Sequence, residues 1–299
     1  MNLFIRIDQF LQRKWKEKSP KIKSDVFYIK VLYFLRMHKV LHLKNPKTFS
    51  EKLQWLKLYA YKPEYTTMVD KYLAKDYVKN IIGEQYIIPT LGAWNKAEDI
   101  DFDSLPVQFV LKTNHDCGGL VICKDKTQFD KQKAINKLNQ HLQYDYFWPG
   151  RDKPYKYVER KIFAEAYMED TKTAELRDYK FFCFDGVVKF MFVASDRQKR
   201  QEPYFDFFDE NYNHLPVRQG HPNAPGLPEK PVCFELMKSL ASKLSKGIPQ
   251  VRVDFYEVDG KVFFGELTFY HFAGMTPFHP AKWDRTFGDM IKLPSEKAV

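Results

Sequence analysis

Val251-Arg-Val-Asp-Phe-Tyr-Glu-Val-Asp-Gly260-Lys-Val-Phe-Phe-Gly-Glu-Leu-Thr268 consists of two alternating apolar and polar runs that meet at Asp259-Gly260. This pattern predicts a β-hairpin. We expect a three-residue turn at residues 258–260, with Gly260 in the left-handed conformation that such turns require. A turn of odd length puts the polar residues on one face of the hairpin: Arg252, Asp254, Glu266 and Thr268. The apolar residues then occupy the other face: Val251, Val253, Phe255, Phe263 and Leu267.

Two acidic residues on one face of this hairpin have two interpretations. Asp254 and Glu266 lie on neighbouring strands, and paired carboxylates on a half-buried sheet are costly unless a cation bridges them. One interpretation is a magnesium site. The other is a solvated sheet face on which Arg252 forms a salt bridge. The hairpin alone leaves both open.

The composition indicates a folded protein with an anionic partner. The 299 residues suffice for one large domain or two to three subdomains, and 44% hydrophobic residues exclude a disordered chain. Lys and Arg exceed Asp and Glu by 48 − 38 = 10. Such an excess suits a nucleotide, an acidic glycan, a nucleic acid or a membrane surface. We expect no nucleic-acid partner, because no zinc spacing, helix-turn-helix pattern or RNA-binding aromatic motif is present.

The cysteines and the first residues predict a cytoplasmic location. The four cysteines form no C-x-x-C pair and no secretory signal is present, so we expect reduced thiols: Cys117, Cys123, Cys183 and Cys233. No apolar run approaches the roughly 20 residues of a membrane span. Residues 1–16 form an amphipathic pattern with a basic end. A helix packed on its own domain and a peripheral contact with the inner face of the membrane are both open.

The order of elements predicts a helical start followed by mixed helices and strands. Helices are expected at residues 26–40, after the capping residues 45–52, and at 66–82, 129–144 and 232–244. Strands are expected at residues 87–91, 107–112, 120–123, 156–159 and 177–193, the last with a turn at Asp185-Gly186. Residues 196–230 show little periodicity, which predicts a long loop or a cover over a site.

A lysine and a glycine loop lie between two of these strands. Lys112 ends an apolar strand, a polar loop with Gly118 and Gly119 follows, and a second strand begins at Leu120. Backbone N–H groups of such a loop can surround phosphates while the lysine supplies a point charge. The loop is not a Walker A motif, because G-x-x-x-x-G-K-[ST] is absent. A surface hairpin with a solvated lysine is the alternative.

Two further segments carry charges beside apolar strands. Residues 157–165 hold Glu159, an apolar residue and Glu165, which could offer backbone groups to adenine and a carboxylate to ribose. Arg177 and Lys180 stand at the entry of an apolar strand, where they could face an anionic ligand. A plain strand-to-loop transition and local ion pairs with Asp178 or Glu175 are the alternatives.

The order of these segments resembles the ATP-grasp superfamily, and in particular its TupA-like branch. The residues that carry the likeness are Asn45 to Tyr59, Asp70-Lys71, Leu105 to Asn114 and Arg177 to Lys180, within residues 40–290. The resemblance implies an α+β fold in which two subdomains clamp ATP, preceded here by a helical N-terminal region. It divides the chain into residues 1–69, a lobe with the phosphate loop at 70–165, and a lobe with the metal hairpin at 166–299.

The resemblance also implies roles for single residues. Lys71 and Lys112 contact the ATP phosphates, and the loop with Asn114, Gly118 and Gly119 closes over them. Adenine and ribose are read by residues of the next segment: Glu159, Arg160, Lys161, Ile162 and, for ribose, Glu165. Magnesium is held by Asp254 and Glu266, with Thr268 where the family has asparagine. A hydroxyl is a poorer ligand than an amide oxygen, which leaves the third ligand open.

The reaction that the resemblance implies is amide formation through an acyl phosphate, with Arg252, Arg177 and Lys180 as catalytic residues. An acidic sugar or glycan and an amine are the expected partners, in bacterial surface (capsular) polysaccharide synthesis. His115 and His271 are candidate general bases. A glycosyltransferase is an alternative, with Asp206-Phe-Phe-Asp209 or Asp101-Phe-Asp103 as its metal motif. A kinase that phosphorylates the glycan and a non-catalytic partner of the polysaccharide machinery are the others.

Overall fold

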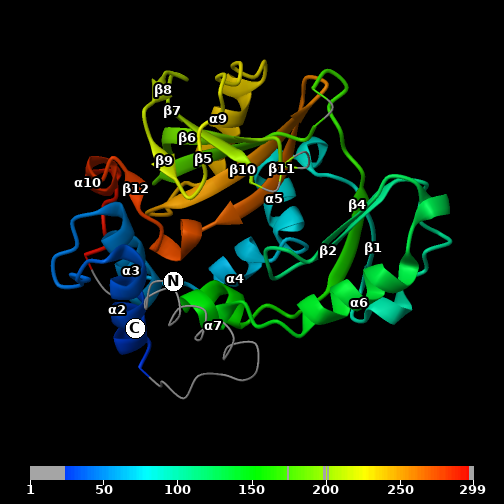
Figure 1. The fold of residues 1–299 in the computed structure, drawn as a ribbon, viewed down its shortest axis with the longest axis horizontal. Coiled ribbons are helices and arrows are strands. Elements are labelled where there is room, and N and C mark those ends of the chain that lie inside the picture. The colour runs from blue at the N-terminus through cyan, green and yellow to red at the C-terminus, as the bar shows by residue number, and fades with distance from the viewer. Residues whose placement is uncertain (1–23, 174, 198–199, 201, 296–299) are drawn as a thin grey trace.

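The computed structural model describes residues 24–173, 175–197, 200 and 202–295 (Figure 1). The amphipathic helix expected at residues 1–16 lies outside this part of the chain. Within it, no helix combines the length and the apolar character that crossing a membrane requires.

A six-stranded antiparallel sheet forms the centre of the molecule, with the strand order β11-β10-β5-β6-β7-β8. Its strands are β5 (Asp178–Phe184), β6 (Val187–Ser195), β7 (Tyr204–Asp209), β8 (His214–Leu215), β10 (Val251–Val258) and β11 (Lys261–Thr268). The two strands expected within 177–193 are confirmed, with Asp185 and Gly186 in left-handed conformations at their turn. The loop expected at 196–230 is wrong in part, because β7, β8 and β9 (Arg218–Gln219) lie in it.

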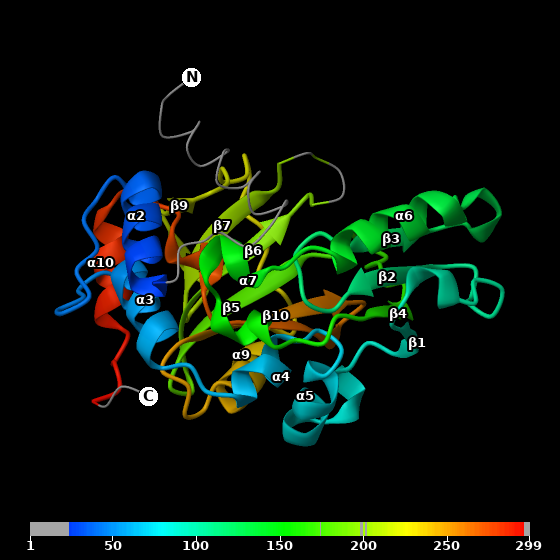
Figure 2. The ribbon, with the colours of Figure 1, turned by 90° about the horizontal axis from the view of Figure 1, so that it is seen from below.

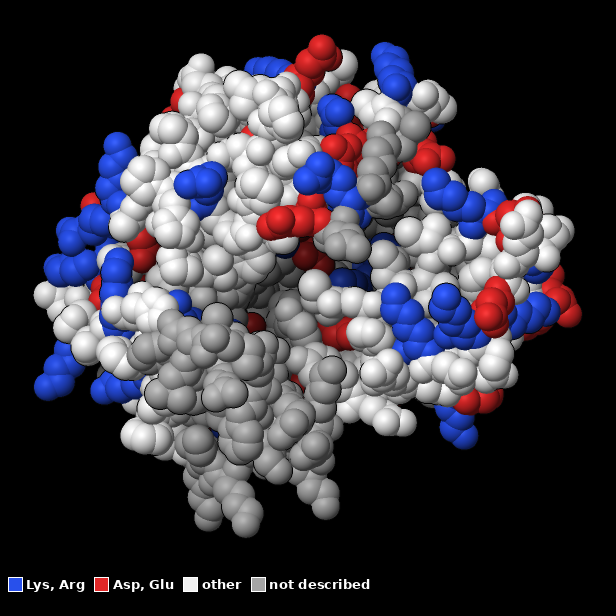
Figure 3. All heavy atoms as spheres, viewed as in Figure 1, with Lys and Arg blue, Asp and Glu red and all other residues white. Residues whose placement is uncertain are grey.

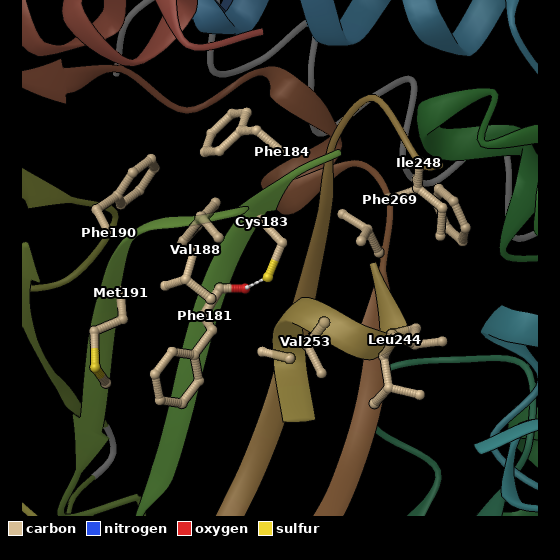
Figure 4. Packing of buried hydrophobic residues seen from close by; sticks show 14 of the residues in the cluster. Phe181, Cys183, Phe184, Val188, Phe190, Met191, Leu244, Ile248, Val253 and Phe269 are labelled. Atoms are coloured by element: carbon tan, nitrogen blue, oxygen red, sulfur yellow. Dashed lines mark hydrogen bonds between the residues drawn. The ribbon is translucent and has the colours of Figure 1, made fainter. Parts of the chain in front are cut away.

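Helices cover both faces of this sheet, which explains why β5 is buried along its whole length. On one face Phe181 packs against Phe234 of α9 (Phe234–Leu244). On the other, Phe182 contacts Phe49 of α3 (Phe49–Tyr59), and Phe190 stacks on a ring of α10 (Lys282–Asp289). Figure 4 shows the side chains of β5 and β6 packed with those of α9 and β10. A strand buried on both faces can be apolar throughout instead of alternating.

The helix expected at residues 66–82 is two helices, α4 (Glu64–Val69) and α5 (Ala74–Ile82). Asp70 lies between them, and its side chain accepts hydrogen bonds from the N–H groups of Tyr72 and Leu73. Such side-chain bonds offer the backbone an alternative to the helix. The break brings the Lys71 side chain to the wall of a cavity.

A second, four-stranded antiparallel sheet has the order β1-β4-β2-β3, and α6 (Lys131–Leu142) covers one of its faces (Figure 2). Its strands are β1 (Thr90–Trp94), β2 (Phe109–Thr113), β3 (Leu120–Cys123) and β4 (Ile162–Ala166). The prediction of a strand at residues 156–159 is wrong. The helical turn α8 (Lys153–Lys156), with Pro154 in its first turn, ends at Lys156, and β4 begins only at Ile162.

Helices of the N-terminal half pack on the six-stranded sheet. Ala74, Val78 and Ile82 of α5 belong to the same core as α3 and the large sheet. Tyr72 and Lys75 also contact Phe163 and Glu165 of the four-stranded sheet described above. α2 (Asp25–Met37) has a small core of its own beside α3. Short elements complete the fold: α7 (Phe147–Gly150), β12 (Phe278–His279) and the 3-10 turns Glu84–Tyr86, Ala97–Asp99, Lys126–Gln128 and His271–Gly274.

The hairpin β10–β11 corrects the expected turn but keeps the expected polar face. Val258 pairs with Lys261, so the turn has two residues, Asp259 and Gly260, both left-handed. A bulge at Gly265 restores the register, because Asp254 pairs with Glu266 while Phe255 pairs with Phe264. Because of this extra residue, the β11 side chains between the turn and the bulge lie on the opposite face from the one expected. Phe264 therefore lies in the core and Phe263 does not, contrary to expectation.

Candidate functional site

A cavity of about 260 Å³ lies between the two sheets, and both contribute to its walls. Figure 3 shows basic and acidic side chains around a hollow between the two parts of the molecule. The apolar part of its lining is Ile88, Val110, Leu120, Ile122, Met168 and Leu176. The charged part is Lys71, Lys112, Asp116, Glu165, Asp178, Lys180, Arg197 and Glu266. The two kinds meet on the four-stranded sheet, where Val110 pairs with Glu165 and Leu120 with Lys112. A ligand with a flat apolar group and an anionic group fits such a lining.

A buried carboxylate holds two lysines at the four-stranded sheet. Glu165 of β4 pairs with Lys112 of β2 at 2.5 Å and with Lys75 of α5 at 2.6 Å. Burial raises the pKa of Glu165, but the charges of Lys112 and Lys75 outweigh it and the pKa lies below its usual value. Burial also lowers the pKa of Lys75, against the effect of Glu165. Sequence reasoning assigned no role to Lys75, which lies four residues after Lys71, in the first turn of α5.

One face of the six-stranded sheet supplies the remaining charges. Opposite residues in an antiparallel pair share a face, and Lys180 of β5 pairs with Asp254 of β10, which pairs with Glu266 of β11. Arg252 donates to both oxygens of Asp254 at 2.7 Å and to Glu266 at 2.9 Å. Lys180 also donates to Asp254, and Lys71 reaches Glu266 at 3.8 Å. The polar face predicted for the hairpin is therefore confirmed.

These contacts fix the charges of two groups. Burial raises the pKa of Glu266, but Lys71, Lys180, Arg252 and Arg197 outweigh it and lower the pKa to about 2. Burial lowers the pKa of Arg252, while Asp254 and Glu266 raise it by more, so the net pKa lies above its ordinary value. Both groups stay charged at neutral pH, which favours an anionic ligand bound together with a cation.

The glycine loop between β2 and β3 has an internal hydrogen-bond network. Asp116 accepts hydrogen bonds from the Thr113 hydroxyl and from His141 of α6. Lys71 donates to the Asp116 carbonyl at 2.5 Å. A side chain on Gly119 would overlap the Thr113 hydroxyl, which explains the glycine. Gly118 and Gly119 both line the cavity, as expected of a loop over phosphates.

Asn114 and residues 159–162 lie behind the cavity wall. The Asn114 side chain donates to Asp70 and to the Glu159 carbonyl, each at 2.8 Å, and accepts from the Lys161 N–H. Asn114 therefore links the glycine loop to Asp70 and to residues 159–161. Four residues expected to read adenine are absent from the lining of the cavity: Glu159, Arg160, Lys161 and Ile162. The residues that line it after β4 are Ala166, Tyr167 and Met168.

Arg177 also lies away from the cavity. Its guanidinium pairs with Glu175, and both line a separate pocket with Tyr204. Alternation along β5 explains the difference, because residues 178 and 180 share the face of Asp254 while residue 177 does not. Asp178, which sequence reasoning missed as a site residue, lies on the cavity and pairs with Lys180 and Arg197.

The carboxylates of the hairpin fit a magnesium ion only together with a ligand. In the described part of the chain, no cluster of three or more His, Cys, Asp and Glu side chains could hold a metal alone. Glu266 lines both cavities, and the Thr268 hydroxyl donates to it at 3.2 Å. Asp254, predicted as a second ligand, is fully buried between Arg252 and Lys180 and lines neither cavity. Magnesium is commonly held by one or two carboxylates plus substrate phosphates, so the donor set fits a nucleotide-bound ion.

Neither histidine has the surroundings of a general base. His271 Nδ1 lies 2.6 Å from Arg252 Nη1, and since a guanidinium only donates, Nδ1 accepts and Nε2 carries the proton. Burial, Arg252 and Lys180 hold the pKa of His271 well below its usual value. His115 is buried with Nε2 at the Tyr144 carbonyl, and burial lowers its pKa.

A second chamber of about 680 Å³ adjoins the first cavity. The two share a set of charged residues and one cysteine: Lys71, Asp116, Cys117, Lys180, Arg197 and Glu266. Beyond them the second chamber is lined by cations and by rings: Arg36, Arg252, Tyr144, Tyr146, Tyr155, Phe192, Phe205, Tyr270, His271 and Phe272. Two ligands bound in the two cavities would therefore meet at Lys71, Lys180 and Glu266.

Comparison with known proteins shows the family of the chain. The family described as TupA-like ATPgrasp matches residues 51–292. Solved structures with a similar fold include D-alanine–D-alanine ligase from Helicobacter pylori, with 14% identity and a TM-score of 0.42 over 73% of this chain and 61% of that chain. Another is an L-amino acid ligase from Bacillus licheniformis, with 13% identity and a TM-score of 0.45 over 84% and 56% of the two chains. No curated protein matches the chain.

This chain and the two ligases differ in length. The chain spans about half to three fifths of the length of those two ligases. At 13–14% identity, the likeness concerns the fold alone.

Proposed function

The chain belongs to the TupA-like ATP-grasp family, and from this membership we propose that it is an ATP-dependent carboxylate–amine ligase. The observation that carries the proposal is the meeting of two cavities at Lys71, Lys180 and Glu266. One cavity suits a nucleotide and the other suits an acid. A reaction between a phosphate and a carboxylate needs both ligands at such a junction.

In this proposal ATP lies in the first cavity. Its adenine packs on apolar residues of the lining, beside residues 166–168, and its phosphates reach the glycine loop and Lys112. Lys71, Lys180 and Arg197 offset the charge of the phosphates at the junction. Glu266, with Thr268 beside it, would hold magnesium, which would supply positive charge to the phosphoryl oxygens, while the buried Asp254 orients Arg252 and Lys180 next to it. Glu165 is only 5% exposed and pairs with both Lys112 and Lys75. We therefore assign it to positioning these two lysines and not to binding ribose.

The chemistry proceeds in two steps. A carboxylate oxygen of the acid attacks the γ-phosphorus, the bond to the β,γ-bridging oxygen breaks, and ADP leaves with an acyl phosphate remaining. An amine then attacks the acyl carbon, and phosphate leaves as the amide forms and the nitrogen loses a proton. Arg252 lines the second chamber beside Glu266 and stabilises the negative charge that develops on the acyl oxygen. Lys180, beside Asp254, offsets charge on the transferred phosphoryl group.

We propose an acidic sugar or glycan as the acid, an amino acid or amino sugar as the amine, and bacterial surface polysaccharide synthesis as the setting. The aromatic and cationic walls of the second chamber support an acidic sugar, because ring faces cover the C–H groups while cations bind the carboxylate. A cytoplasmic protein, with peripheral contact to the inner membrane or capsule machinery, is part of the proposal. Its four free cysteines suit a reducing compartment.

No structural observation favours a glycosyltransferase. Asp206 is fully buried and accepts from the Ala224 N–H. Asp101 accepts from the N–H groups of Asp103 and Ser104, in a turn before β2. None of the Asp-x-Asp or Asp-x-x-Asp carboxylates lines either cavity. A glycan kinase would use the same nucleotide site and differs in its product.

A product assay tests the proposal. The protein is incubated with ATP, magnesium, a panel of uronic acids and either natural amines or hydroxylamine, which traps acyl phosphates. We expect acid-dependent release of ADP and phosphate, with a hydroxamate in the hydroxylamine arm. A stable phosphate ester would show a kinase, and release of UDP from UDP-sugars would show a glycosyltransferase. Absence of ADP release with every acid, and of thermal stabilisation by ATP, would contradict the ligase.

A further inference from the structure

A short turn at residues 271–274 forms one wall of the second chamber and has an unusual backbone. Phe272 and Ala273 have φ values of 49° and 54°, and Gly274 follows with 65°. Left-handed conformations are costly for residues other than glycine, and runs of them persist only where the surroundings enforce them. The turn directly follows Thr268 to Tyr270 at the end of β11 and includes His271.

His271 leaves one polar atom for a ligand. Its Nδ1 accepts a hydrogen bond from Arg252, so its Nε2 carries a proton. Nε2 has no hydrogen-bond partner among the described residues, although the side chain is only 2% exposed. A buried donor without a partner is costly and points to a bound group that supplies one. His271 and Arg252 both line the second chamber.

Two fully buried polar residues of α3 hold the turn in place. Gln54 Nε2 donates to the carbonyls of Ala273 at 2.8 Å and Gly274 at 3.0 Å. Lys57 Nζ donates to the carbonyls of Ala273 at 2.9 Å and Gly150 at 2.8 Å, and it pairs with Asp152 at 2.7 Å. Both side chains are 0% exposed. A buried ammonium costs stability unless every proton is satisfied, so its place here needs a reason.

The partners of Lys57 supply that reason. Gly150, Asp152 and Ala273 all line the second chamber, and Gly150 lies close to Ala273 although the two are far apart in the sequence. Lys57 therefore joins two separate segments of the chamber lining. It lines neither cavity itself, and neither does Gln54.

We propose that the 271–274 turn is a positioning device for the acid substrate, which Lys57 and Gln54 of α3 fix so that His271 Nε2–H and Arg252 hold the carboxylate together. The inference rests on the proposed ligase function and assigns the second chamber to its acid, a sugar carboxylate. Lys57 and Gln54 are positioning residues that act through the turn. Helix α3 thereby takes part in binding the acid and not the nucleotide.

Calorimetry with two probes tests the device: ADP with magnesium, and D-glucuronate or D-galacturonate added to the ADP complex. Lys57→Met keeps the volume and removes the ammonium. We expect it to weaken uronate binding by about tenfold and ADP binding by less than about twofold, because the lost hydrogen bonds come from a charged group behind one chamber only. Lys52→Met is the matched control, since Lys52 on the same helix donates to the carbonyls of Gly288 and Ile291 instead. It should leave both affinities unchanged.

A second variant guards against loss of folding in Lys57→Met. Ala273→Gly suits the left-handed backbone and should keep or raise the melting temperature, while it frees the turn and weakens uronate binding. His271→Asn, whose amide oxygen can still accept from Arg252, should lose uronate binding because it has no donor at the ε position. Wild-type uronate affinity in both Ala273→Gly and His271→Asn would overturn the inference, as would equal losses of uronate and ADP affinity in Lys57→Met.

The outcome also separates the inference from the proposed function. If wild-type protein binds uronate and the variants bind it equally well, the ligase stands and the positioning device falls. If neither uronate binds the wild-type ADP complex, the inference falls together with the sugar-acid part of the proposed function. Retained ADP binding would then keep the nucleotide site.

Discussion

At the scale of single residues, the charges of the site balance one another before any ligand binds. Asp254 is fully buried and bonds Arg252 and Lys180, whereas the Glu266 side chain is 34% exposed and bonds Arg252. The two carboxylates therefore differ in task. Asp254 holds the cations of the sheet in place, and Glu266 presents an oxygen to the cavity.

This difference in task predicts different effects when each carboxylate is replaced by its amide. Asp254→Asn should lower the free energy of unfolding by about 3 kcal/mol, because Arg252 and Lys180 lose a buried partner. Glu266→Gln should change stability less and should abolish the magnesium dependence of ADP binding. Urea unfolding and calorimetry with and without magnesium measure both effects. Equal magnesium dependence in wild type and Glu266→Gln would remove Glu266 from the metal site.

The lowered pKa of Glu266 predicts a pH dependence of stability. The pKa falls from 4.5 in the unfolded chain to about 2 in the folded protein, so the unfolded state binds the proton first as pH falls. The stabilisation by ionised Glu266 is complete above about pH 5 and is lost between about pH 4.5 and 2. Urea unfolding between pH 6 and 3 should show a smaller loss of stability in Glu266→Gln than in wild type. Identical slopes would contradict the assignment.

The sequence alone identified the site residues that can be recognised from their type and from their neighbours in the chain. Lys71, Lys112 and the hairpin acids stand out by type and spacing. The structure brings Lys71, Lys112 and Glu266 to the cavity and buries Asp254 beside Glu266. Lys75, Asp178 and Arg197 were missed because their roles depend on partners far along the chain, such as Glu165 for Lys75. The alternation of β5 could have excluded Arg177 and chosen Asp178.

At the scale of elements, the hairpin β10–β11 decides whether the site forms. Its two-residue turn would place Glu266 on the core face, and the bulge at Gly265 returns it to the face of Asp254. The sequence could not show this combination, because a three-residue turn and a two-residue turn with a bulge give the same polar face. The same limit applies to α4 and α5, where side-chain bonds from Asp70 interrupt a continuous helical pattern.

Insertion of one residue after Gly265 tests the register that the bulge sets. We expect this variant to lose ADP binding, because a second extra residue turns Glu266 toward the core or shifts the strand. Insertion of one glycine after Gly260 is the control, since it lengthens the tip of the hairpin beyond the site and should keep ADP binding. Calorimetry with ADP and magnesium measures both. Wild-type affinity in the variant with a residue inserted after Gly265 would show that the register set by the bulge has no part in forming the site.

At the scale of the whole molecule, two sheets with separate cores share one ligand site. The four-stranded sheet packs with α6, the six-stranded sheet packs with α3, α5, α9 and α10, and the cavity lies between them. The order of motifs predicted this division into two clamping parts. It did not predict that the N-terminal helices join the core of the large sheet, because the apolar face of a helix does not show which sheet the helix packs against.

A shared site predicts joint protection by the nucleotide. In hydrogen exchange, ADP with magnesium should slow exchange in both the β2–β3 loop and β11, which lie on different sheets. Residues 282–289 of α10, remote from both cavities, provide the internal control and should change little. Protection confined to one sheet would show that the nucleotide does not bridge them.

The formation of an acyl phosphate is the central claim, and transfer of oxygen tests it most directly. The acid that supports ADP release is labelled with ¹⁸O in its carboxylate, and the phosphate released with the amide is analysed by mass spectrometry. The account predicts one ¹⁸O in each phosphate, because a carboxylate oxygen bonds phosphorus and leaves with it. Phosphate without ¹⁸O, formed while ADP is released, would contradict the account.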